Sequence, residues 1–202
     1  KMGVVGQVIS GEFGKVLVRQ KSDNDIELGE LLVAESNDSK ILFQVYDLMY
    51  GSQISQQNLE LMSGLKLEED NDLEVYDSNL RNYKLALMKN LITLNKNNCS
   101  VCKTLPSFFS NVREIDNNDV IFNSKPQNSI TLGKLRSGSK VLDIDVNLPG
   151  DKVLAEHLLV AASTGKGKSN LVKSVLWGLI DKDYCGILIL DPHDEYFGRN
   201  GL

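Results

Sequence analysis

The sequence of 202 residues is poor in several residue types, with three cysteines, two histidines, four prolines and one tryptophan. No apolar run approaches the roughly 20 residues that a membrane-spanning helix requires, and no signal peptide opens the chain. Lysine and arginine form no dense block and the net charge is −5, so the footprint of a standalone DNA-binding module is missing. These absences predict a cytoplasmic protein without a membrane partner.

The scarcity of cysteine and histidine also argues against a structural metal site. Cys99 and Cys102 have the spacing of a zinc or redox pair. A structural zinc site needs a second pair of ligands, and none follows at a suitable spacing. We therefore interpret Cys99 and Cys102 as ordinary loop thiols.

Short strand-like segments dominate the first part of the chain. They are apolar or alternating, are separated by polar turns, and cover residues 3–9, 15–19, 28–35 and 40–47. Regular spacing of this kind predicts a small β-barrel.

The middle of the chain is less regular. Residues 55–65 favour a helix with Gly64 as its C-cap. Residues 83–94 fit either a helix or an alternating strand. Residues 95–129 are irregular, and two further strand candidates, 129–135 and 140–148, follow.

The turn Pro149-Gly150 marks the predicted domain boundary, because the pattern then changes to strand, loop, helix and strand. The fold class expected is α+β and α/β, with a β-barrel domain that includes a helical and loop insertion over residues 1–150. The beginning of a P-loop α/β domain would occupy residues 151–202. Its strands, 158–162 and 186–190, would flank a helix over 168–180, and the second is apolar throughout, as in a buried parallel sheet.

The loop Ala162-Ser-Thr-Gly-Lys-Gly-Lys-Ser169 matches the phosphate-binding pattern G-x-x-x-x-G-K-[ST] at every position but the first. Lys168 would reach the β- and γ-phosphates, and the Ser169 hydroxyl would ligate Mg²⁺. A coincidental Gly/Lys turn is the alternative, but the strand before it and the helix after it argue for a nucleotide site. The predicted cofactor-binding residues are Ser163, Thr164, Gly165, Lys166, Gly167, Lys168, Ser169 and Asn170.

A second motif, Asp191-Pro-His-Asp-Glu-Tyr196, follows the last apolar run. Asp191 looks like a Walker B acid, but only one helix and one strand fit between it and Lys168. Where a further strand is inserted beside the P-loop strand, this position is not the Walker B acid. We predict that Asp191 and Glu195 lie in the nucleotide pocket. Asp191 would bind the metal, and Glu195 would be a catalytic residue together with Lys168. The alternative is that Asp191 caps the turn and the rest is solvated.

The two motifs together resemble those of the HerA family of archaeal and bacterial DNA translocases, within the HerA–FtsK group of P-loop ATPases. The similarity rests on His157-Leu-Leu-Val-Ala-Ala-Ser-Thr-Gly-Lys-Gly-Lys-Ser-Asn170 and Ile187-Leu-Ile-Leu-Asp-Pro-His-Asp-Glu-Tyr196. The family's second motif usually reads Asp-x-His-Gly-Glu-Tyr, so Asp194 replaces a glycine. Lys166 stands where the family has a small residue, and it could contact a phosphate, a neighbouring subunit or solvent.

The N-terminal region is similar to the small β-barrel that HerA proteins share with ATP synthase subunits. Met2-Gly-Val-Val-Gly-Gln-Val and Leu28-Gly-Glu-Leu-Leu-Val resemble its opening strands. Leu105-Pro-Ser-Phe-Phe and Ile130-Thr-Leu-Gly-Lys-Leu-Arg resemble its closing part. This resemblance implies that residues 83–94 form a strand.

The resemblance implies a homohexameric ring that hydrolyses ATP with Mg²⁺ and moves duplex DNA through its channel as a translocase or helicase. The barrels would dock a nuclease of the NurA type or another effector, in DNA end processing (repair) or anti-phage defence. A RecA-like motor continues with a Walker B acid pair, a sensor, an arginine finger and pore loops. We therefore expect this chain to be a fragment that is inactive as an ATPase on its own.

The sequence also bears on two alternative functions. The barrel could scaffold an effector, with nucleotide only stabilising the ring. A Ras-like GTPase is rejected because an Asn-Lys-x-Asp motif should follow the P-loop, whereas the one similar stretch, at Asn95, precedes it.

Overall fold

The computed structural model describes residues 3–36, 39–69, 81–95, 99–120 and 127–196. The chain divides into two compact units, the first made of residues 1–121 and 136–140 and the second of 122–135 and 141–202. The predicted boundary at Pro149-Gly150 lies within the second unit. Among the described residues, no helix combines the length and the apolar character needed to cross a membrane.

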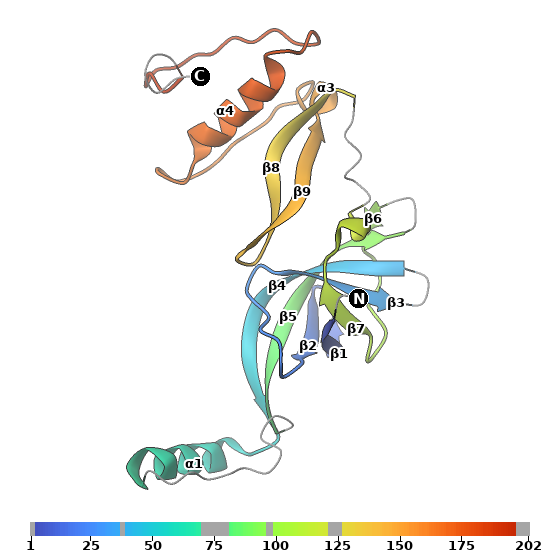
Figure 1. The fold of residues 1–202 in the computed structure, drawn as a ribbon, viewed down its shortest axis with the longest axis vertical. Helices are drawn as coiled ribbons and strands as arrows, with labels where there is room; N and C mark the ends of the chain where they lie inside the picture. The colour runs from blue at the N-terminus through green and yellow to red at the C-terminus, as the bar shows by residue number, and fades with distance from the viewer. Residues whose placement is uncertain (1–2, 37–38, 70–80, 96–98, 121–126, 197–202) are drawn as a thin grey trace. The chain divides into compact units, whose positions relative to one another are not determined.

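Six strands of the first unit close into an antiparallel barrel, which confirms the predicted β-barrel (Figure 1). The ring runs β1-β7-β3-β4-β5-β2, and pairing of β2 with β1 completes it. Four register shifts interrupt three of the pairings, and such bulges help strands to bend around a barrel. The strands are β1 (Val4–Glu12), β2 (Lys15–Gln20), β3 (Leu31–Ser36), β4 (Ser39–Ser52), β5 (Asn82–Leu94) and β7 (Asn111–Glu114).

Alternation along these strands produces the barrel core. Val16 and Val18 of β2 point inward, as do Ile41, Phe43 and Val45 of β4. Phe43 is completely buried. Because successive side chains of a strand face opposite sides, an alternating sequence fills one interior and leaves a polar exterior.

Residues 82–94 form strand β5, so the strand interpretation of 83–94 is confirmed. β5 pairs with both β2 and β4, and it also carries the short strand β6 (Cys99–Val101). The irregular assignment of 95–129 was wrong in part, because β6 and β7 lie within it. β7 has only four residues, which is too few for a periodic signal.

Cys99 and Cys102 lie in different environments, so they are not both ordinary loop thiols. Cys99 begins β6, whereas Cys102 is buried in the barrel core. The Cys102 thiol donates to the Thr104 carbonyl at 3.4 Å and accepts from the Asn90 amide at 3.6 Å. Both thiols are free. Cys102 is thus a core residue with polar partners of its own.

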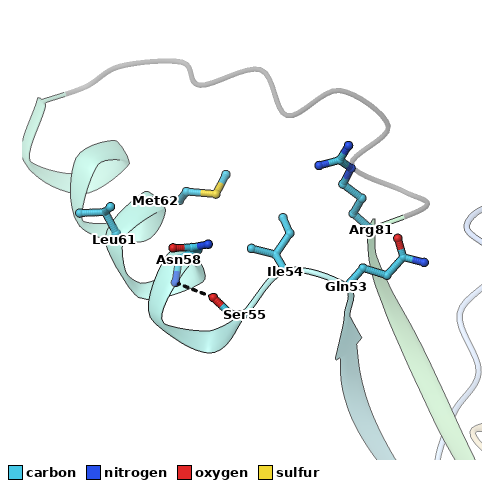
Figure 2. Close-up of a pocket in the computed structure, with 7 residues that line it drawn as sticks. All are labelled: Gln53, Ile54, Ser55, Asn58, Leu61, Met62 and Arg81. Atoms are coloured by element: carbon cyan, nitrogen blue, oxygen red, sulfur yellow. Dashed lines mark hydrogen bonds between the residues drawn. The ribbon is translucent and has the colours of Figure 1, made fainter.

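The predicted helix is present as α1 (Gln56–Glu69), at the ends of β4 and β5 (Figure 1). Ser55 caps it, since its hydroxyl accepts the Asn58 N–H at 3.5 Å (Figure 2). The predicted C-cap at Gly64 was wrong, because good helix formers at Leu65 and Leu67 continue the helix past it. A pocket of about 610 Å³ beside α1 is lined by Gln53, Ile54, Ser55, Asn58, Leu61, Met62 and Arg81.

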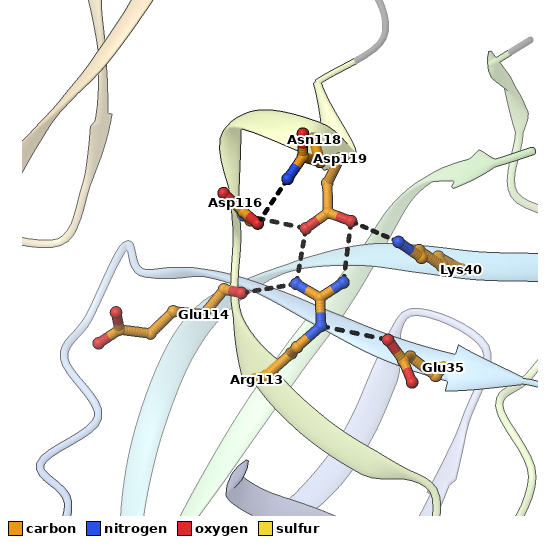
Figure 3. A network of polar contacts seen from close by, with 7 residues as sticks. All are labelled: Glu35, Lys40, Arg113, Glu114, Asp116, Asn118 and Asp119. Carbon is orange, nitrogen blue, oxygen red and sulfur yellow. Dashed lines mark hydrogen bonds and ion pairs between the residues drawn. The ribbon is translucent and has the colours of Figure 1, made fainter. Parts of the chain in front are cut away.

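A network of ion pairs and hydrogen bonds surrounds the Asp119 carboxylate of the barrel unit (Figure 3). The Asp119 side chain, only 1% exposed, receives two hydrogen bonds from the Arg113 guanidinium, at 2.6 and 2.8 Å. Lys40 donates to the same carboxylate at 2.8 Å, and the Asp116 backbone N–H does so at 2.9 Å. Arg113 also pairs with Glu35 at 3.2 Å. The buried carboxylate is therefore fully partnered.

The described residues of the second unit form two helices and most of a two-stranded sheet. The predicted strands 129–135 and 140–148 are present as β8 (Ser129–Ser137) and β9 (Lys140–Pro149). A single-turn helix α3 (Gly150–Val153) follows β9. The predicted helix after the P-loop is α4 (Lys168–Leu179).

The turn between β8 and β9 belongs to the first unit and is tied to its residues. The Ser137 hydroxyl accepts the Leu31 N–H at 2.8 Å, and the Ser139 N–H and hydroxyl donate to Glu27 at 2.6 and 2.9 Å. The Ser139 hydrogen bonds, first from its side chain and then from its backbone, lower the pKa of Glu27. This turn is therefore an integral part of the barrel unit.

Candidate nucleotide-binding site

The P-loop has the backbone geometry that its sequence requires. Gly165 and Gly167 adopt φ angles of 77° and 84°, and no atom lies within 4 Å of where a Cβ would be at either position. The glycines are thus needed for their left-handed conformation rather than for space. The Lys166 N–H donates to the Ser163 carbonyl at 3.2 Å, which closes the turn.

Helix α4 starts directly after the loop, with Gly167 as its N-cap. Residues 161–168 are solvent-exposed, so the N-terminus of a twelve-residue helix opens to solvent at the loop. Backbone N–H groups and the helix dipole favour an anion at such a position. The eight residues predicted to bind nucleotide form this loop and the first turn of α4: Ser163, Thr164, Gly165, Lys166, Gly167, Lys168, Ser169 and Asn170. Their contacts with phosphate stay a prediction.

The structure brings the second motif to the first turn of α4. The Ser169 hydroxyl donates a hydrogen bond to the Glu195 carboxylate. Glu195 is exposed, and a hydroxyl beside a carboxylate supplies the hard oxygen donors that Mg²⁺ prefers. These residues therefore fit a magnesium–nucleotide site. In the described part of the chain no three His, Cys, Asp or Glu residues cluster as a protein-only metal site, and phosphate-bound Mg²⁺ needs no such cluster.

Asp191 is directed back toward its own segment. Its Oδ2 accepts the Tyr196 backbone N–H at 2.8 Å. Desolvation acts to raise the pKa of Asp191, but hydrogen bonds from the backbone N–H groups of Tyr196, Glu195 and His193 outweigh it, so the pKa lies below its usual value. The Asp191 carboxylate is therefore ionised at neutral pH and stabilises the turn that carries Glu195.

Two residues with contacts in this region were not singled out from the sequence. The Lys173 ammonium lies over the Tyr196 ring, 5.9 Å from its centroid. Lys173 follows Ser169 by one helical turn, so both lie on the same face of α4. The pattern Ser169 with Lys173, at i and i+4, is the sequence signal that could have drawn attention to this contact.

The exposed loop of the second motif contains one unusual backbone conformation. Asp194 has a φ of 54°, in the left-handed region where glycine is favoured. The glycine usual in the motif that this segment resembles fits that conformation, and aspartate is among the few other residues that tolerate it.

Replacing Asp194 with alanine is expected to destabilise the turn by about 1 kcal/mol, because alanine lacks the local hydrogen bonds that help aspartate adopt a positive φ. Asp194→Gly should leave the turn intact. Amide hydrogen exchange at Tyr196, whose N–H is bonded to Asp191, measures both variants. Equal exchange rates in the Ala and Gly variants would contradict the role of the φ angle.

The two predicted strands around α4 differ from expectation. Neither 158–162 nor 186–190 belongs to a β-ladder within the described residues. A strand requires a hydrogen-bonded neighbour, and these two segments do not pair with each other. Their leucines are accordingly exposed, with 88% of Leu159, 86% of Leu188 and 83% of Leu190 accessible. The parallel sheet of the predicted RecA-like domain is thus not formed by this pair alone.

Helix α4 is amphipathic within the second unit. Leu176 and Leu179 are buried, Val175 is half-buried, and Leu171 is exposed. Trp177 lies on the solvent side with 60% of its surface accessible. An apolar cavity of about 310 Å³ lies beside the helix. It is lined by Ile130, Leu132, Leu148, Val153, Leu154, Leu158, Leu159, Val160, Ala161, Leu171 and Val175.

Comparison with known proteins agrees with this arrangement. Residues 130–201 match the family model described as the central domain of helicase HerA. A DNA double-strand break repair helicase HerA of Sulfurisphaera tokodaii is 27% identical over 205 residues, covering 96% of this chain and 36% of the relative. The HerA of the same description from Saccharolobus solfataricus is 25% identical over 177 residues, covering 87% and 33%.

A probable helicase of Methanocaldococcus jannaschii is 39% identical over 66 residues, which are 32% of this chain and 13% of the relative. The chain spans about a third of the length of the two HerA relatives, 33% and 36%. The match to HerA proteins extends over the barrel as well as the P-loop region. The chain is therefore similar to HerA helicases along most of its length, and its residues 130–201 match the HerA central domain.

Proposed function

We propose that this chain provides the N-terminal barrel and the P-loop of a HerA-type ATP-dependent DNA translocase or helicase. The observation that carries the proposal is the contact between Ser169 of the P-loop helix and Glu195 of the second motif. Residues that are distant in sequence meet there at a helix N-terminus, a position that favours an anion such as phosphate. The match of residues 130–201 to the HerA central domain and the names of the HerA relatives support the same function.

The proposed roles follow from this geometry. Lys168 binds the β- and γ-phosphates of ATP, and the backbone N–H groups from Ser163 to Asn170 cradle them. Ser169 supplies its oxygen to Mg²⁺, which when bound neutralises developing phosphate charge. Glu195 orients the Ser169 hydroxyl and lies where it can position an attacking water. Asp191 is proposed to act on the metal through water while it holds the turn that carries Glu195.

The proposal extends to the assembly. We infer a homohexameric ring in which ATP is hydrolysed between subunits and duplex DNA passes through the channel. A nuclease of the NurA type, or another effector, would dock on the barrel and act with the motor in DNA repair or antiviral defence. The extent of the HerA relatives, which are about three times as long as this chain, supports reading it as part of a larger motor.

The experiment is nucleotide binding and DNA-stimulated ATP hydrolysis by the full-length protein with Lys168→Ala. Loss of a charge-assisted phosphate contact is expected to weaken ATP binding by about 10- to 100-fold and to abolish hydrolysis. Lys152→Ala removes an exposed lysine of α3 and serves as the matched control, with binding and hydrolysis unchanged. Wild-type hydrolysis by Lys168→Ala would exclude the proposed site.

A second candidate is an effector-binding scaffold whose ring is stabilised by nucleotide. The observation that favours it is the adjacent pair Phe108 and Phe109, which are 70% and 67% exposed on the barrel unit. Phe109 is held at a φ of 59°, an uncommon conformation for a bulky residue. Exposed aromatic side chains are typical anchors of protein interfaces. If Lys168→Ala abolished hydrolysis but left the effector-dependent activity intact, the scaffold role would be favoured over the motor.

A further inference from the structure

Helix α4 and the second motif are joined at two successive positions. Ser169 contacts Glu195, and Lys173, one turn later on the same helix face, contacts Tyr196. Glu195 and Tyr196 are neighbours in sequence. Two side chains of one helix face thus contact two successive residues of the motif.

The second of these contacts is better shielded than the first. Lys173 and Tyr196 are both half-buried, whereas Glu195 is exposed. An ammonium above an aromatic ring is attracted by the negative face of that ring. The Tyr196 backbone is in turn fixed by the 2.8 Å hydrogen bond from its N–H to Asp191. Tyr196 is therefore tied to the helix by its ring and to the turn by its backbone.

A lone hydrogen bond from Ser169 would be a weak means of holding Glu195. Exposed polar contacts compete with water, and their net contribution is small. Asp194, immediately before Glu195, adopts a left-handed conformation that must be maintained by its surroundings. The contact between Lys173 and Tyr196 supplies a second attachment directly after Glu195.

We propose that Lys173 and Tyr196 form a clamp that holds the Asp191–Tyr196 segment on α4 and so positions Glu195 at Ser169 for metal-bound nucleotide. Lys173 is a positioning residue in this arrangement, because it acts through Tyr196 and Glu195. The inference rests on the proposed nucleotide site and deepens it. It assigns the metal-dependent part of ATP affinity to a contact outside the P-loop.

The test measures ATP dissociation constants of the full-length protein with Mg²⁺ and with EDTA. Lys173→Met keeps the length of the side chain but removes its charge. It should reduce the gain in affinity that Mg²⁺ provides by about two- to five-fold, the lower range for a cation–π contact, while ATP affinity in EDTA stays unchanged. Lys173→Arg should restore the gain, since a guanidinium also stacks on an aromatic ring.

Variants of the ring complete a double-mutant cycle. Tyr196→Phe keeps the aromatic face and should behave as wild type, whereas Tyr196→Ala should reproduce Lys173→Met. The double variant Lys173→Met/Tyr196→Ala should be no weaker than either single variant. Lys182→Met, which removes a lysine just beyond α4, should have no effect. Additive losses in the double variant, or an equal loss of affinity in EDTA, would overturn the clamp.

A readout without nucleotide separates this inference from the proposed function. Amide exchange across residues 191–196 of the nucleotide-free protein should accelerate in Lys173→Met and Tyr196→Ala, but not in Lys173→Arg. Unchanged exchange in Lys173→Met would refute the clamp whatever the protein binds. Accelerated exchange in a protein that binds no ATP would support the clamp and refute the nucleotide site.

Discussion

Replacing Arg113 with leucine is expected to lower the free energy of unfolding of the barrel by about 3–5 kcal/mol. The substitution removes both Arg113 hydrogen bonds from the Asp119 carboxylate and leaves a buried negative charge with Lys40 as its remaining ionic partner (Figure 3). A buried charge that loses its main partner costs more than the pair itself contributes. Urea unfolding of the variant and the wild type at pH 7 measures the loss.

A matched control separates burial from charge. Lys15 pairs with Glu12 at 3.4 Å, and both side chains are largely exposed. Lys15→Leu should change stability by no more than about 1 kcal/mol, because exposed ion pairs contribute little. The double variant Arg113→Leu/Asp119→Leu should recover part of the loss, since it removes the stranded charge. A loss below about 1 kcal/mol in Arg113→Leu would contradict the role of the network.

The same network predicts how stability depends on pH. Desolvation acts to raise the pKa of Asp119, but the hydrogen bonds from Arg113, Lys40 and the Asp116 N–H outweigh it and hold the pKa well below its usual range. A group with a depressed folded-state pKa contributes stability above its unfolded pKa, about 3.9 for aspartate, and loses it as pH falls further. The difference in stability between wild type and Arg113→Leu should therefore shrink from pH 7 toward pH 3.

Phe43→Ala is expected to destabilise the barrel by about 3–5 kcal/mol, because it opens a cavity in a completely buried position. Phe43 lies on β4, where Ile41 and Val45 flank it on the same inner face. Phe43→Leu preserves most of the volume and should cost about 1.5 kcal/mol. Denaturant unfolding with an unchanged m-value would show that only stability has altered.

Strand β4 also provides the control for this experiment. Tyr50 is 89% exposed on the same strand, so Tyr50→Ala should change stability by no more than about 0.5 kcal/mol. Comparable losses from Phe43→Ala and Tyr50→Ala would mean that burial inside the barrel does not decide the stability of β4.

The sequence predicted those parts of the fold that local patterns determine. Alternation over residues 15–19 predicted β2, and Val16 and Val18 are indeed its inward residues. Residues 83–94 were ambiguous because strand and helix periodicities overlap there. Pairing with β2 and β4, which are far away in sequence, decides that this segment is a strand. β7 was missed because four residues carry no period, although they close the barrel.

In the candidate site, too, features of local motifs differ from contacts between separate segments. Gly165 and Gly167 were predicted from a local motif, and their positive φ angles accord with it. The sequence predicted a pocket role for both Ser169 and Glu195, but the hydrogen bond between them depends on the fold. The strands expected at 158–162 and 186–190 fail for a related reason. An apolar run indicates that a segment can be buried in a sheet. It does not identify the segment that lies beside it.

The sole tryptophan of the chain, Trp177, lies on the solvent side of α4, about two helical turns beyond Ser169. Indole emission shifts with the polarity around the ring, so excitation of the chain near the red edge of protein absorbance selects a single fluorophore. That fluorophore stands on the helix whose first turn carries the P-loop residues. The proposed nucleotide binding can therefore be tested optically in the unlabelled chain, on the timescale of a stopped-flow mixing experiment.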